Sequence, residues 1–208
     1  MISDIVAFIQ QMAGSSTLEL IAVTLGLINI TLIIRRSVWN FPFGMVMVAI
    51  YSHIFFDNQL YSDAALQIYF FAMQLYGWWY WLKGRTDRGL IKVASIGARR
   101  LTLVFAGCGL GTLALGTLVG QLSDAAFPYW DGSIAVLSVT AQFLMSRRYI
   151  ENWVLWILVD VLAVGLFYAK GLYPTAALYT VFLVMATMGL LQWQRAKRRQ
   201  GSPSAMLA

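Results

Sequence analysis

The chain has 208 residues, of which 60% are hydrophobic and only 12% charged, and its mean hydropathy is +0.69. A soluble domain carries about twice that charged fraction, so the composition predicts an all-α membrane protein and excludes an ordinary soluble domain. The net charge of +6 does not indicate a nucleic-acid partner, because the basic residues gather on one side of a membrane. One cysteine and one histidine, Cys108 and His53, provide neither an internal disulfide nor a metal site.

Seven apolar segments follow an amphipathic lead-in over residues 1–17. Each is close to the roughly 20 residues that a helix needs to cross a bilayer. We expect transmembrane spans at residues 18–34, 38–56, 61–82, 101–122, 131–146, 151–169 and 172–194. From Arg195 the chain is basic and polar, and we expect it to fray into disorder.

The basic residues indicate the orientation of the spans. Fourteen of the fifteen Lys and Arg residues fall in the loops after spans 1, 3 and 5 and in the tail, whereas the other side has only Lys170. The positive-inside rule therefore places the N-terminus outside and the C-terminus in the cytoplasm.

An internal repeat runs through the chain at an offset of 112 residues. It matches Leu60-Tyr61-x-x-Ala64-Ala65-Leu66 with Leu172-Tyr173-x-x-Ala176-Ala177-Leu178, and it pairs Arg35 with Arg147, Asn40 with Asn152, Gly77 with Gly189 and Trp81 with Trp193. Both copies begin outside, so they are parallel repeats joined by an odd helix, the glycine-rich span 4.

The repeat predicts how the domains are organised. We expect a three-helix bundle over 18–82, a cytoplasmic loop and linker helix over 83–129, a second bundle over 130–194 and a cytoplasmic basic tail over 195–208. This 3+1+3 arrangement is typical of the sugar-transporter (SWEET) architecture. Such a fold predicts a ligand site between the bundles near the midplane and alternating access by rocking of one bundle.

Span 6 contains the strongest candidate for a binding site. Trp153, Trp156 and Asp160 share one helix face, and Asp160 lies near the middle of the bilayer. A carboxylate there costs about 3 kcal/mol on insertion scales. A belt position for Trp153 and a structural contact for Asp160 are the alternatives. We interpret the face as a site for a flat cation, with the indoles as stacking partners.

Other polar residues lie inside the spans and need partners there. Structural hydrogen bonds and ligand contacts are both open for these residues. The candidate ligand contacts are Gln67 and Gln74 in span 3, Gln142 in span 5 and Tyr179 in span 7, and the candidate gate or helix-cap residues are Trp39, Asn40 and Asn152.

Other functional classes have little support in the sequence. There is no P-loop, no H-E-x-x-H motif and no Cys/His cluster, so we expect no enzyme activity, cofactor or metal. The rival class is a receptor that transports nothing. It would need a cytoplasmic effector surface, and the loops and tail are short for one.

Five short motifs in the chain are informative together: Asn40-x-x-Phe43-Gly44, Gln59-Leu60-Tyr61, Tyr76-Gly77-Trp78, Phe127-Pro128-Tyr129-Trp130-Asp131 and Glu151-Asn152-Trp153-x-x-Trp156. Through these motifs the chain resembles the PnuC family of bacterial vitamin transporters. The resemblance implies uptake of nicotinamide riboside across the bacterial inner membrane by facilitated diffusion, trapping by a cytoplasmic vitamin kinase, a SWEET-like fold and a homo-oligomer. Members associated with this vitamin often have Asn at the position of Asp160, so thiamine, another flat aromatic cation, is the alternative substrate.

Overall fold

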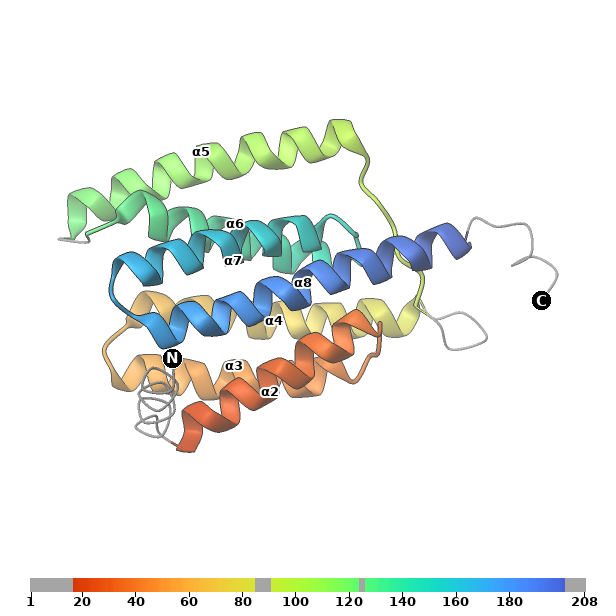
Figure 1. Ribbon diagram of the computed structural model, residues 1–208, viewed down its shortest axis with the longest axis horizontal. Helices are drawn as coiled ribbons and strands as arrows, with labels where there is room; N and C mark the ends of the chain where they lie inside the picture. The colour runs from red at the N-terminus through yellow and green to blue at the C-terminus, as the bar shows by residue number, and fades with distance from the viewer. Residues whose placement is uncertain (1–16, 85–90, 124–125, 201–208) are drawn as a thin grey trace, which may run out of the picture. The chain divides into compact units, whose positions relative to one another are not determined.

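The computed structural model describes residues 17–84, 91–123 and 126–200, and its regular elements there are all α-helices. The predicted lead-in over residues 1–17 lies, apart from Thr17, outside the described residues. The seven described helices are α2 (Thr17–Ile34), α3 (Asn40–Asp57), α4 (Tyr61–Lys83), α5 (Ala98–Leu122), α6 (Pro128–Ser146), α7 (Asn152–Ala169) and α8 (Tyr173–Gln200) (Figure 1). The predicted all-α, seven-helix fold is confirmed.

The helix ends agree with the predicted spans. Every described helix except α8 begins and ends within three residues of the span predicted for it. By length and apolar composition, four of these helices are able to cross a membrane: α2, α5, α7 and α8.

The prediction that the chain frays from Arg195 is wrong over the described residues, because α8 continues to Gln200. Arg, Lys and Gln are good helix formers, and basic residues interact favourably with the C-terminal end of a helix. With the side-chain amide of Gln200 oriented to suit its neighbours, its nitrogen donates to the Val93 carbonyl at 3.1 Å and its oxygen accepts from the Val93 amide at 3.2 Å. The end of α8 is therefore held by a contact as well as by helix propensity.

The chain divides into two compact units between Ile91 and Lys92, and the repeat is visible in the geometry of each. The helix α3 of unit 1 and the helix α7 of unit 2 begin 112 residues apart and end 112 residues apart. Before each helix, Arg36 and Arg148 adopt the left-handed backbone conformation, with φ of 57° and 64°. Asn40 and Asn152 each donate from Nδ2 to a carbonyl three residues earlier, at 2.6 Å. The two units therefore share the geometry of their turns.

Unit 1 is built around α3, which packs against both α2 and α4. Phe41 at the start of α3 meets Trp81 of α4 edge to face, with ring centroids 5.2 Å apart, and both side chains are fully buried. The turn after α2 is also tied to the segment after α4, because Arg36 Nη1 donates to the Ile91 carbonyl at 3.2 Å.

In unit 2, α6 packs against α5 and α7, and α7 lies beside α8 (Figure 1). The buried apolar core of this unit comes from α5, α6 and α7 and consists of Cys108, Leu137, Ala141, Leu144, Leu155 and Val159. This core holds the middle of α7, where the candidate site residues lie.

The motif Phe127–Asp131 opens α6 and joins it to α5. Pro128 occupies the first turn, where its missing N–H costs nothing. The ring of Tyr129 lies against Gly116 of α5 so closely that a Cβ on this glycine would collide with it. The Tyr129 hydroxyl lies 3.2 Å from Thr117 Oγ1. The absence of a side chain at Gly116 therefore allows α5 and α6 to pack closely.

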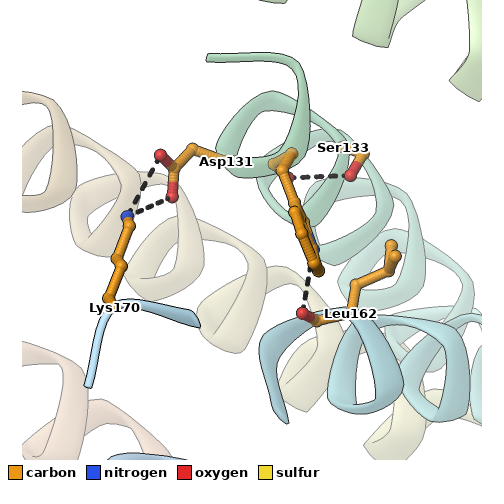
Figure 2. A network of polar contacts seen from close by, with 5 residues as sticks. Asp131, Ser133, Leu162 and Lys170 are labelled. Carbon is orange, nitrogen blue, oxygen red and sulfur yellow. Dashed lines mark hydrogen bonds and ion pairs between the residues drawn. The ribbon is translucent and has the colours of Figure 1, made fainter. Parts of the chain in front are cut away.

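The same motif joins α6 to α7. Trp130 Nε1 donates to the Leu162 carbonyl at 2.9 Å, while the Trp130 carbonyl accepts a hydrogen bond from Ser133 Oγ (Figure 2). Figure 2 also shows Lys170 Nζ facing both oxygens of Asp131, at 3.1 and 3.2 Å. The motif thus fixes the positions of α6 and α7 relative to each other.

Candidate functional site

Asp160 lies in the middle of α7 with 4% of its surface exposed. Among the residues that the structure describes, none donates a hydrogen bond to its carboxylate or pairs with it as a cation. Placing a carboxylate at such a depth costs about 3 kcal/mol, and charged groups inside membranes usually have partners. This burial without a partner makes Asp160 the leading candidate for a contact with a cationic ligand.

Trp156 lies four residues before Asp160 in α7, on the same helix face. Its indole is half-buried and packs against the apolar core of unit 2, so one side of the ring is held in place. The repeat counterparts of Trp156 and Asp160 are Gly44 and Val48. An indole followed four residues later by a carboxylate therefore occurs on α7 and not at the corresponding positions of α3.

Trp153 is placed differently from Trp156. It is 3% exposed, and its ring lies so close to Gly189 of α8 that a Cβ there would be 2.6 Å from three ring atoms. It meets Trp193 edge to face at 5.6 Å, as Phe41 meets Trp81 in unit 1. Because both copies contain this packing, the position of Trp153 fits a role in holding α7 against α8.

Gln142 supplies a second polar group in unit 2. It lies on α6, which packs against α7, and is 6% exposed. Its Nε2 atom is buried and has no hydrogen-bond partner within the part of the chain that the structure describes. A buried donor without a partner lowers stability by about 1–3 kcal/mol, so a ligand that offered an acceptor here would recover that free energy on binding.

Unit 1 contains a cluster of amides that sequence reasoning found only in part. Gln74 is 3% exposed, and its Oε1 atom is buried with no hydrogen-bond partner in the described ranges. Its amide nitrogen lies beside Asn29 Nδ2 over Gly44, where an added Cβ would collide with both. Asn29 also donates to the Asn40 carbonyl at 2.6 Å. Asn29 was missed, although an amide in the middle of the first apolar span was a usable signal.

The candidate gate or cap residues fall into two groups. Asn40 and Asn152 are fully buried at the first positions of α3 and α7, and each holds the preceding turn through its Nδ2. Their Oδ1 atoms are buried, and no described residue forms a hydrogen bond with them. Trp39, by contrast, is 66% exposed. The side chain of a helix cap accepts a hydrogen bond from a backbone N–H, whereas the side-chain amides of Asn40 and Asn152 donate to a backbone carbonyl.

The remaining two candidates, Gln67 and Tyr179, are only partly buried. Gln67 is half-buried on α4. Tyr179 on α8 stacks on Phe167 of α7 with centroids 5.2 Å apart, which places it toward the other end of α7 from Trp153.

A model of the nicotinamide mononucleotide transporter family matches residues 16–195. The chain belongs to this family. The nicotinamide riboside transporter PnuC of Escherichia coli (strain K12) is 31% identical over 90% of this chain and 89% of its own length. The riboflavin/roseoflavin transporter RibM of Streptomyces davaonensis is 28% identical over 89% of this chain and 88% of its own length. Relatives within the nicotinamide mononucleotide transporter family thus have names that refer to more than one vitamin.

A solved structure supports the same assignment. The crystal structure of the vitamin B3 transporter PnuC matches with a TM-score of 0.75 and 25% identity, covering 94% of this chain and 88% of that one. The resemblance to PnuC proteins is therefore confirmed. As a member of the nicotinamide mononucleotide transporter family, the protein is a multi-pass membrane transporter of small vitamins and not an enzyme.

Proposed function

We propose that this protein carries nicotinamide riboside across a bacterial inner membrane by facilitated diffusion with alternating access. The names of the relatives support this substrate. The observation that carries the proposal is the buried Asp160 carboxylate, which has no partner among the described residues and lies one helical turn from Trp156.

The roles of these two side chains follow from the ligand's chemistry. Nicotinamide riboside contains a flat pyridinium ring, so Asp160 offsets its positive charge and Trp156 stacks on its face. A desolvated cation–π contact contributes roughly 1–2 kcal/mol. A hydrogen bond to a charged group contributes about 1.5–3 kcal/mol. Such a site binds in the micromolar range or more weakly, as suits a carrier that must release its ligand.

Each unit also offers a buried amide as a candidate ligand contact. Gln142 Nε2 of unit 2 is a buried donor and Gln74 Oε1 of unit 1 a buried acceptor, each without a hydrogen-bond partner among the described residues. They suit the carboxamide and ribose hydroxyls of the vitamin, which both donate and accept hydrogen bonds. Gln67 and Tyr179 are proposed as secondary contacts. We assign Trp153 a positioning role because its ring packs on Gly189 and Trp193.

The orientation and the cellular partners are part of the proposal. The distribution of Lys and Arg supports an outer N-terminus and a cytoplasmic C-terminus. A facilitator alone only equilibrates its substrate, so we propose that a cytoplasmic vitamin kinase traps the product. We also propose that the chain assembles as a homo-oligomer.

The test is uptake of labelled nicotinamide riboside into proteoliposomes without a kinase. Uptake should stop at equal concentrations inside and outside. Asp160→Ala should weaken apparent affinity about 10- to 100-fold, from the loss of a charge-assisted contact. Asp57→Ala, the same change at a side chain that is 59% exposed, should leave uptake unchanged. Equal activity of the two variants would refute the site, accumulation above equilibrium would refute facilitation, and no uptake would favour a receptor.

Thiamine belongs in the same assay because Asp160 would also offset its charge. The relatives described above are named for nicotinamide riboside and riboflavin, which favours nicotinamide riboside. Unlabelled thiamine should therefore compete weakly. Strong competition by thiamine together with slow uptake of nicotinamide riboside would reverse the assignment of the substrate.

A further inference from the structure

A cavity of about 530 Å³ lies in unit 2, among α7, α8 and the segment that precedes α5. Its walls include Glu151 and Val154 at the start of α7 and Leu190, Lys197 and Arg198 toward the end of α8. Asp160 does not line this cavity, which therefore differs from the proposed vitamin site.

The segment that precedes α5 forms the third wall of the cavity and is held in place by hydrogen bonds. Ala94 exchanges backbone hydrogen bonds with the turn between α6 and α7, donating to Arg148 and accepting from Ile150, both at 2.9 Å. The Ser95 hydroxyl and the Ile96 amide both donate to the Glu151 carboxylate. The wall is thus built from fixed backbone and does not depend on one mobile side chain.

The charge in the cavity favours an anion. Lys197 and Arg198 are exposed, and within the described ranges neither forms an ion pair. The one acidic wall residue, Glu151, is already engaged by two donors. Two cations therefore face a single, partly compensated carboxylate.

The depth of the cavity matches the surface of a membrane. The large exposed side chains in this part of α8 are the apolar Val184, Met188 and Leu191, whereas the exposed residues from Gln192 to Gln200 are all polar or basic. This change marks the level at which the hydrocarbon gives way to headgroups. The cavity spans this level, with Leu190 on its apolar side and Gln194, Lys197 and Arg198 on its basic side.

An apolar track leads from the cavity toward the hydrocarbon. Val154 lines the cavity, and Leu158 and Val161 follow it along the same face of α7, with 37% and 51% of their surfaces exposed. An acyl chain fits such a track, whereas a free phosphate would make no use of it.

We propose that this cavity binds the headgroup of an anionic phospholipid, with the phosphate on Lys197 and Arg198 and an acyl chain along Val154, Leu158 and Val161. Basic pockets between helices at the cytoplasmic surface recognise lipid headgroups through this combination of charge and apolar contact. The bound lipid would bridge α7, α8 and the extended segment. This inference goes beyond the vitamin proposal and does not rest on it.

The test measures lipid binding to the full chain in a detergent of neutral headgroup. Native mass spectrometry would count the phosphatidylglycerol molecules retained by the wild type, by Lys197→Gln/Arg198→Gln and by Arg195→Gln/Arg199→Gln. The second variant removes the same charge from the same part of α8, outside the cavity lining. The cavity variant should bind about 30-fold more weakly, or about fivefold for each cation removed, and the control variant should bind like the wild type.

Three outcomes would overturn the proposal. Equal losses in the two double variants would show that only general surface charge is involved. Equally tight binding of phosphatidylethanolamine, whose ammonium group could reach Glu151, would show a site for zwitterionic headgroups. Displacement of phosphatidylglycerol by millimolar inorganic phosphate would show an anion site that does not use the apolar track. Retention of phosphatidylglycerol alone, lost only in the cavity variant, supports the proposal.

Discussion

Gly189→Ala is the most direct test of how α7 and α8 pack. An added Cβ would lie 2.6 Å from three ring atoms of Trp153, well inside ordinary van der Waals contact. The ring has little room to move, because it is 3% exposed and meets Trp193 edge to face. Overpacking of this kind costs about 1–3 kcal/mol.

A matched glycine separates the collision from helix propensity. Gly109 lies within the helix α5, and an added Cβ there meets nothing within 4 Å. Gly109→Ala should therefore gain up to about 1 kcal/mol from propensity alone. The free energies of unfolding of the two variants, measured by titration with a denaturing detergent, should differ by the 1–3 kcal/mol assigned to the collision.

The contact with Trp153 can be tested by a double-mutant cycle. Trp153→Phe removes the ring atoms that the new Cβ would meet, so Gly189→Ala should cost less in that background. If Gly189→Ala is as stable as Gly109→Ala, or if the two changes at Gly189 and Trp153 are additive, the described packing of α7 on α8 is wrong.

Three further predictions concern the site and its supports. Trp156→Ala should weaken nicotinamide riboside binding about 5- to 30-fold in a calorimetric titration, whereas Trp153→Phe should change it less than threefold. Gly44→Ala should displace the flexible Gln74 amide and lower uptake affinity about 2- to 10-fold, with little change in the free energy of unfolding. Asp131→Asn should cost about 0.2–1 kcal/mol of stability through its partly exposed ion pair, and less at high salt.

Each of these predictions has an outcome that contradicts it. A larger binding loss for Trp153→Phe than for Trp156→Ala would make Trp153 the stacking residue. A large loss of stability in Gly44→Ala would mean that Gln74 cannot move aside. If the stability of Asp131→Asn depends on salt in the same way as that of the wild type, the pairing of Asp131 with Lys170 contributes nothing to stability.

The seven helices, and all of their ends except that of α8, were predictable because each is an apolar run of about 20 residues bounded by polar or basic residues. Arg36 and Arg148 are turn residues at equivalent places, and each precedes an Asn that holds the turn through its side chain. Such signals depend on neighbours in the chain, so the repeat transfers them from one unit to the other. The error at α8 came from equating a polar composition with disorder, although Arg, Lys and Gln favour helix.

The proposed charged centre could be picked out from the sequence, but the packing around the candidate residues could not. An acidic residue deep in a span stands out in any sequence, so Asp160 is the first candidate for a ligand contact. The placement of Trp153 on Gly189, and of Gln74 beside Asn29 over Gly44, depends on how two helices cross. A linear pattern shows which residues share a helix face, but it does not show which face meets which neighbour.

The matching ends of α3 and α7 make each unit an internal control for the other. A side chain that serves only packing should tolerate exchange for its counterpart in the other copy, since α3 and α7 have the same length and similar preceding turns. A side chain that contacts the ligand should not, because its counterpart lacks the chemical group that the contact needs. Exchanging Trp153 for the Phe found at 41, and Asp160 for the Val found at 48, would therefore separate scaffold from cargo recognition within a single molecule.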